Sequence, residues 1–265
     1  MDPSPPTFWS GLRWADVVAI VGALAWLPYI IRLFLKPRVT IIPGGTIEIG
    51  FTGLGPIVNP SLAFRTEHKD ALVAAIEFDV AHQRGQRATF RAVQLHETGA
   101  MTQSTSGESA VHQRTQSTVA IVLTPASIAE RKVVCQEREH LATYQQRLVA
   151  YQAAVRRVQN NDAERWLADA MASPECHALR DFWTGEFFWQ PGRYTVTARA
   201  KVAELSTEAT TSFAFELTDA QIQLLRSNQV GLEWELVRIA RAAGVPNING
   251  PETFKWHWEY STSSQ

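Results

Sequence analysis

The strict alternation of apolar and polar side chains over residues 193–202 constrains the fold of this chain more than any other feature. The apolar side chains on every second position are Tyr194, Val196, Ala198, Ala200 and Val202. Because successive side chains of a strand point to opposite faces, the pattern predicts a strand with one buried face. The same alternation recurs in segments 47–51, 76–80, 119–123 and 213–217. With weaker segments at 38–43, 61–67 and 87–95, it predicts about seven or eight antiparallel strands.

The segment WQPGRYTVTARAKV, from Trp189 to Val202, resembles the Pro-Gly-x-Tyr-x-Val strand of immunoglobulin-like and related bacterial sandwich domains. This resemblance implies an immunoglobulin-like antiparallel sandwich in which Tyr194 packs at a corner of a sheet. The cysteine pair of antibody domains is absent, and the resemblance implies no function. We therefore expect a mainly β fold with helical additions, with a sandwich domain over residues 38–217.

An apolar segment predicts a transmembrane helix over residues 14–37, preceded by a short tail of residues 1–13. The run from Trp14 to Leu35 has 22 residues. At helical rise it is roughly 33 Å long, enough to cross a hydrocarbon core of about 30 Å. The residues expected to anchor it are Trp14, Trp26, Pro28, Tyr29, Arg32, Lys36 and Arg38. A cleaved signal peptide and a buried core helix are the alternatives.

The charges that flank this segment predict the side on which the remaining chain lies. Arg13 precedes the apolar run, whereas Arg32, Lys36 and Arg38 lie at its other end. Because Lys and Arg favour the cytoplasmic side, the bulk of the chain is expected to be cytoplasmic. The alternative is a periplasmic or extracellular domain in the opposite orientation.

Residues 126–183 predict a helical hairpin inserted into the sandwich. Ser127 is the expected cap of a helix that reaches about residue 159. From Leu141 onward its apolar residues recur with the heptad spacing of a coiled coil, and Glu137 interrupts this seam. Asn161 and Ser173 are the expected caps of two shorter helices that follow. The candidate partner-binding residues on this seam are Leu141, Tyr144, Leu148, Tyr151 and Val155. Either the seam packs on its own return helices, or it pairs with a partner or a second copy.

The C-terminal region, residues 218–265, predicts helices followed by an aromatic strand. Thr218 and Gln221 have the spacing of a capping box. The aromatic residues that alternate afterwards are Phe254, Trp256, Trp258 and Tyr260. This strand either covers the core or presents a partner-binding strip. The small, polar segment 96–116 predicts a mobile loop.

No residue pattern in the chain indicates a catalytic or cofactor site. The net charge of −1 gives no reason to expect nucleic acid as a partner. Cys135 with His140 and Cys176 with His177 could form a zinc site. In the predicted hairpin, however, the two cysteines lie on the order of 15 Å apart, too far for shared ligation or a disulfide. We expect no catalytic residues, cofactor or metal.

These expectations favour a membrane-anchored, non-enzymatic scaffold, sensor or assembly subunit that acts through protein–protein contacts. Its partners would be the lipid bilayer and a protein, or a second copy of the chain. Two alternatives stay open: a tethered extracytoplasmic adhesion or ligand-binding domain, and a membrane-bound enzyme or effector whose site is built from scattered residues.

Overall fold

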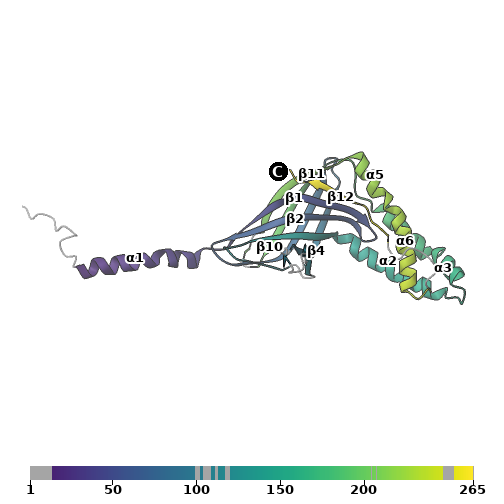
Figure 1. Ribbon diagram of the computed structural model, residues 1–265, viewed down its shortest axis with the longest axis horizontal. Coiled ribbons are helices and arrows are strands. Elements are labelled where there is room, and N and C mark those ends of the chain that lie inside the picture. The colour runs from purple at the N-terminus through teal and green to yellow at the C-terminus, as the bar shows by residue number, and fades with distance from the viewer. Residues whose placement is uncertain are drawn as a thin grey trace, which may run out of the picture.

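The structure, a computed structural model, describes residues 14–98, 102–103, 109–110, 113–116, 120–203, 205–206, 208–246 and 254–264. The predicted tail of residues 1–13 lies outside these residues, as do residues 99–101, 104–108 and 111–112 of the predicted loop 96–116. The described residues of that segment lie in strands, which corrects the prediction of a loop there. One large antiparallel sheet dominates the molecule. Most helices cluster at one end of this sheet, and α1 (Trp14–Phe34) projects from the other end (Figure 1).

The strands follow one another along the sheet in the order β11-β10-β3-β4-β9-β2-β1-β12, with β7 paired to β4 and β8 paired to β3. Two further strands, β5 and β6, pair with each other. The bounds are β1 (Arg38–Thr52), β2 (Gly55–Glu67), β3 (Ala71–His82), β4 (Arg87–Thr98), β5 (Thr102–Gln103), β6 (Ser109–Ala110), β7 (Gln113–Gln116), β8 (Ile121–Leu123), β9 (Ile128–Glu137), β10 (Gly192–Val202), β11 (Ala209–Leu217) and β12 (Trp258–Thr262).

The sheet curls until its two edges nearly meet, which corrects the expected two-layered sandwich. Ala214 in β11 and Ser264, just beyond β12, exchange backbone hydrogen bonds of 2.8 and 2.9 Å. The described strands thus form a nearly closed, barrel-like sheet. Alternation requires only that one face be buried, so it does not distinguish two facing sheets from one curled sheet.

The inward face of this sheet is the one that the alternation predicts. The predicted inward residues that the structure describes are at most 3% exposed: Ile47, Ile49, Phe51, Ile76, Phe78, Val80, Ile121, Leu123, Tyr194, Val196, Ala198, Ala200, Val202, Phe213, Phe215 and Leu217. Val119 lies outside the described residues. Tyr194 accepts from Gln190 N at 2.6 Å and donates to Gln190 O at 2.9 Å, which fixes the turn before β10. The burial of these alternating positions, together with the single large sheet, confirms the prediction of a mainly β fold.

The helical additions occupy two stretches of the chain. Their bounds are α2 (Arg138–Arg157), α3 (Ala163–Met171), α4 (Pro174–Gly185), α5 (Asp219–Ser227) and α6 (Gln229–Ala242). The cap at Ser173 and the capping box of Thr218 with Gln221 are confirmed, whereas α3 begins after Asp162 rather than the expected Asn161.

The predicted start of the first inserted helix at Ser127 is wrong. Residues 128–137 form β9, in which Val133 and Cys135 point inward and are buried. This strand lies between β2 and β4. The hydrogen bonds and burial supplied by two neighbouring strands outweigh the helical propensity of this segment, as tertiary context commonly does.

The N-terminal helix forms where it was predicted, but the prediction of a membrane span is wrong. Within the described residues, no helix is both long enough and apolar enough to cross a bilayer. The uncharged run from Val17 to Ile31 has 15 residues, fewer than the roughly 20 that a bilayer core requires. The longer run depended on placing Arg32 within it. The expected single-pass topology, and the orientation derived from its flanking charges, therefore lose their basis.

The residues expected to anchor α1 are only partly described. Trp26 and Tyr29 are exposed and contact each other edge to face, with ring centroids 6.1 Å apart. Lys36 and Arg38 are exposed at the entry to the sheet. The side chains of Trp14, Pro28 and Arg32 lie outside the described part of the chain.

Candidate ligand-binding site

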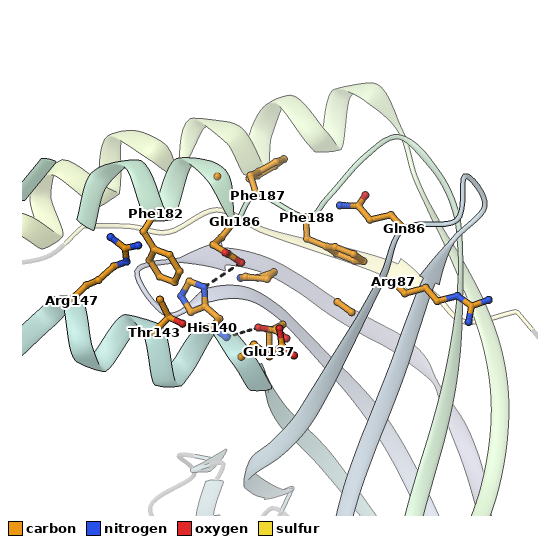
Figure 2. A pocket seen from close by; sticks show the side chains of 14 residues that line it. Gln86, Arg87, Glu137, His140, Thr143, Arg147, Phe182, Glu186, Phe187 and Phe188 are labelled. Atoms are coloured by element: carbon orange, nitrogen blue, oxygen red, sulfur yellow. Dashed lines mark hydrogen bonds and ion pairs between the residues drawn. The ribbon is translucent and has the colours of Figure 1, made fainter. Parts of the chain in front are cut away.

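The candidate site lies where the helical segment leaves the sheet and where it returns. The chain passes from β9 directly into α2 at Glu137, and it returns from α4 to β10 through Glu186, Phe187 and Phe188. A cavity of about 420 Å³ lies between these two junctions. Figure 2 shows His140 joined by dashed lines to Glu186 above it and to Glu137 below it.

Glu137 ends the strand and begins the helix. Its backbone is extended, with φ −65° and ψ 132°, and its carboxylate accepts a hydrogen bond of 2.5 Å from His140 N. A carboxylate in this position satisfies a free amide of the first turn and is stabilised by the helix dipole. Glu137 was the residue that interrupted the predicted heptad seam, because it is a cap and not a seam position.

Gly55 allows the His140 ring to lie against the start of β2. Its φ of +85° falls in the left-handed region, and a Cβ there would lie 2.6 Å from Cε1 and Nε2 of His140. The ring stacks on Phe182 with a centroid distance of 4.7 Å and an interplanar angle of 28°. Two independent requirements, backbone conformation and space, thus favour glycine at position 55.

Neither ring nitrogen of His140 has a hydrogen-bond partner, although the residue is only 2% exposed. Burial lowers the pKa of His140 to about 4. The nearby backbone of Gly53 opposes this decrease, although it forms no regular hydrogen bond to the ring. At neutral pH the imidazole is therefore uncharged, with one nitrogen as donor and the other as acceptor.

The carboxylate nearest to this imidazole belongs to Glu186. Its Oε2 lies 4.0 Å from Nδ1 of His140, and its side chain is 42% exposed. Partial burial raises the pKa of Glu186, and the negative charges of Glu137 and Glu139 raise it further, against an opposing effect of Arg147. The site thus contains a carboxylate whose negative charge is incompletely neutralised.

Two guanidinium groups, of Arg87 and Arg147, also belong to the cavity wall, but neither forms a hydrogen bond with the His140 ring. Arg147 lies over the Phe182 ring, 5.1 Å from its centroid, and donates to Ala178 O at 3.0 Å. In Figure 2 Arg87 points away from His140, whereas the guanidinium group of Arg147 lies beside Phe182. The polar surface closest to the imidazole is therefore acidic.

A second cavity of about 390 Å³ lies beside the first turn of the sheet and is bordered by Tyr144, Trp256 and Trp258. Its main charged groups satisfy each other, since Arg238 donates to both carboxylate oxygens of Glu235. Among the described residues, the other buried side-chain atom without a partner is Oε2 of Glu175, whose Oε1 is held by Arg157 at 2.8 Å. The His140 cavity therefore has the stronger need for an added hydrogen-bond partner.

The predicted seam is largely covered by the chain itself. Tyr144, Tyr151 and Val155 are buried, and Leu148 packs against the same core, while Leu141 is half-buried. Tyr151 donates toward Leu236 O in α6 at 3.4 Å. Of these residues, Tyr144 reaches the candidate site, where its ring lies parallel to that of His140 with centroids 6.1 Å apart.

The aromatic residues of the C-terminal region do not reach the His140 cavity. Phe254 and Trp256 are half-buried and contact each other edge to face. Trp258 lies opposite Gly50 of β1, where a Cβ would meet its ring at 2.4 Å. Tyr260 is 63% exposed and donates to Glu48 at 3.0 Å. The strand pairs with β1 and helps to close the sheet.

The two cysteines are buried, free and on different elements, Cys135 in β9 and Cys176 in α4. Burial raises the pKa of both thiols. Within the described residues, no group of three or more His, Cys, Asp or Glu side chains could hold a metal ion.

The sequence patterns identified neither His140 nor Glu186 as a binding residue. His140 was considered only with Cys135 in a zinc site, which the distances in the expected hairpin excluded. Glu139, in the first turn of α2, was a usable signal for a helix start, because Asp and Glu are enriched in that turn. The approach of Glu186 could not be read, because it lies 46 positions beyond His140 and is brought back by three helices.

No protein-family model matches this chain, and no curated protein is significantly similar to it.

Proposed function

We propose that this chain is a non-enzymatic ligand-binding module that takes a small polar molecule into the His140 cavity. The observation that carries the proposal is the buried imidazole without a partner at either nitrogen. A buried polar group that lacks a hydrogen bond costs about 1–3 kcal/mol. Such groups are rare in native structures and call for a missing partner or a functional reason. A ligand that hydrogen-bonds to His140 would recover this cost.

The shape and composition of the cavity support this proposal. A volume of about 420 Å³ falls within the usual range of small-molecule sites, roughly 300–1,000 Å³. Phe182, Phe187 and Phe188 supply apolar surface, and His140 with Glu186 supplies the polar groups that orient a ligand.

Binding is favoured over catalysis because the site contains no activated nucleophile among its described lining residues. Thr143 lies in the wall, yet neither nitrogen of His140 accepts its hydroxyl. A nucleophilic hydroxyl requires a base within hydrogen-bond reach. The arrangement can therefore hold a polar group and exchange protons with it, but it lacks the pairing used in covalent catalysis.

The proposal is tested by NMR of the full chain with labelled histidine side chains. We expect the His140 ring signals to shift when compounds are added from a panel of small amines, carboxylates, sugars and nucleosides. The His140→Leu variant should lose the accompanying rise in melting temperature. His177→Leu, at an exposed position of α4, is the matched control and should keep it. A panel that leaves the His140 signals unchanged would contradict the proposal.

A second candidate function, association with another protein or a second copy, is supported by α1. Described side chains on all sides of this helix are apolar and exposed, including Val18, Leu24, Leu27 and Phe34 at 48–82%. Exposed apolar surface of this extent marks an interaction site in many proteins. If α1 associates, light scattering should show an oligomer that Leu24→Glu with Leu27→Glu converts to a monomer. A wild-type monomer would contradict self-association through α1.

A further inference from the structure

We propose that the ligand of this cavity is a primary ammonium group on a short aliphatic chain, held between Glu186 and Nδ1 of His140. The inference rests on the proposed binding function and specifies the class of ligand. The ammonium could belong to a free alkylamine or to a lysine side chain, since both offer the same chemistry.

The gap between Glu186 and His140 fits a shared donor. The 4.0 Å between Oε2 and Nδ1 exceeds a direct hydrogen bond, which spans about 2.7–3.2 Å. A ligand nitrogen placed about 2.8 Å from both atoms would make an Oε2–N–Nδ1 angle of roughly 90°. Two N–H bonds of a tetrahedral ammonium can reach both acceptors at this angle. A carboxylate accepts only, and a neutral imidazole accepts at one nitrogen, so a group with two donors satisfies both.

The charges around the gap favour a cation over an anion. Glu137 and Glu139 both act on Glu186 electrostatically, and both line the same cavity. Arg87 points away from the imidazole (Figure 2), and the guanidinium group of Arg147 lies over Phe182. The effect of Arg147 on Glu186 is smaller than the opposing effects of Glu137 and Glu139. An anion at Nδ1 of His140 would be repelled by the nearby carboxylate of Glu186, whereas an ammonium would neutralise part of its charge.

The aromatic residues of the cavity wall indicate which chemical group accompanies the ammonium in the ligand. Phe182 stacks on the imidazole, and Phe187 and Phe188 follow Glu186 along the chain toward β10. Aromatic faces attract ammonium groups and also pack against methylene groups. The Glu186 side chain is 42% exposed, so a charged headgroup can enter from solvent at this side. A short chain of about four carbons suits a cavity of this volume.

The test uses the full chain at pH 7 and measures dissociation constants by titration calorimetry and by the NMR signals of His140. The compounds are n-butylamine, 1,4-diaminobutane and Nα-acetyl-lysine amide, with n-butanol and butyrate as uncharged and anionic counterparts. We expect the amines to bind at least tenfold more tightly than n-butanol and butyrate not to bind. Tighter binding of the lysine amide than of butylamine would assign the ammonium to a lysine side chain, and the reverse would assign it to a free amine.

Two variants test whether the ammonium contacts Glu186. Glu186→Gln keeps the shape of the side chain but removes its charge, and should weaken butylamine binding at least tenfold. Glu208→Gln is the matched control: Glu208 is about equally exposed and lies beside Arg199, at the start of β11. The dissociation constant of the Glu208→Gln variant for butylamine should stay within twofold of that of the wild type.

The two proposals fail in different ways. If butyrate or butanol shifts the His140 signals and the amines do not, the cavity binds ligands and the ammonium assignment is wrong. Equal weakening by the Glu186 and Glu208 variants would also overturn the assignment. If none of the five compounds shifts the His140 signals or releases heat, the ammonium assignment is overturned. If the wider panel also leaves these signals unchanged, the binding function is overturned with it.

Discussion

Two buried histidines, His82 in the sheet and His140 at its helical end, are enclosed in similar ways and satisfied in opposite ways. His82 is 3% exposed and its ring lies 4.7 Å from that of Tyr194; His140 is 2% exposed and lies 4.7 Å from Phe182. In the sheet, Nε2 of His82 bonds to Pro191 O at 3.2 Å, and Nδ1 accepts from Arg84 N at 3.4 Å. His140 has neither contact.

This difference separates the part of the molecule that holds the fold from the part that we assign to binding. Around His82, the polar atoms of the interior are satisfied within the chain: Trp189 donates to Gly50 O at 2.8 Å, and Tyr194 bonds to Gln190. Around His140, the chain leaves donors and acceptors open.

Removal of an interior aromatic of the sheet should have the largest effect. Trp189→Ala would leave a cavity among Phe90, Tyr194 and Phe215 and leave Gly50 O without its donor. We expect a loss of about 3–5 kcal/mol in the free energy of unfolding, as for other buried tryptophans. Urea unfolding measures this loss. A loss below about 1 kcal/mol would mean that the interior of the sheet is no better packed than the site.

Acidification should destabilise the folded state through His140. The folded chain keeps this imidazole neutral down to about pH 4, whereas an unfolded histidine protonates near pH 6.5. The unfolded state therefore binds more protons between these values, and stability falls as the pH drops through this window. The contribution present above pH 6.5 and lost near pH 4 is roughly 3 kcal/mol.

The comparison of wild type with His140→Leu isolates this contribution from the carboxylates that titrate in the same range. We expect urea unfolding at a series of pH values to show a flatter curve for the variant between pH 6.5 and 4. Parallel curves for the two proteins would show that His140 is not held neutral by burial.

Alanine at two glycines should separate backbone strain from crowding of His140. Gly55 and Gly85 both have positive φ, +85° and +95°, but a Cβ at Gly85 meets nothing within 4 Å. Gly85→Ala should cost about 1 kcal/mol from strain alone. Gly55→Ala should cost roughly 2–3 kcal/mol, because the ring of His140 must also move. Equal losses in thermal unfolding would show that His140 does not pack against Gly55.

The same substitution at the two histidines should have opposite consequences for stability. His82→Leu removes two satisfied nitrogens and leaves Pro191 O unpaired, and should cost about 1–3 kcal/mol. His140→Leu removes two unsatisfied nitrogens, and should be neutral or stabilising by up to about 1 kcal/mol at pH 7. Equal destabilisation in urea would mean that His140 is as well satisfied as His82.

Much of the strand architecture could be predicted from the sequence because side-chain alternation is a local property. Every described inward position that the alternation identified is buried, and the cap at Ser173 and the capping box at Thr218 also form as predicted. Local patterns failed where two neighbouring strands supplied the deciding hydrogen bonds, as in β9, and where an apolar run had to be long enough to cross a bilayer, as in α1.

The sequence by itself determined which face of the predicted strands is buried and where α4 and α5 begin. Only the tertiary structure decided that the strands form one nearly closed sheet, because alternation is identical in a curled sheet and in two facing sheets. The tertiary structure also decided which residues form the candidate site. His140 and Glu186 meet because β9 runs into α2 without a loop and α4 returns the chain to the same end of the sheet. Contacts between residues far apart in the chain depend on this return path, which no local pattern of residues encodes.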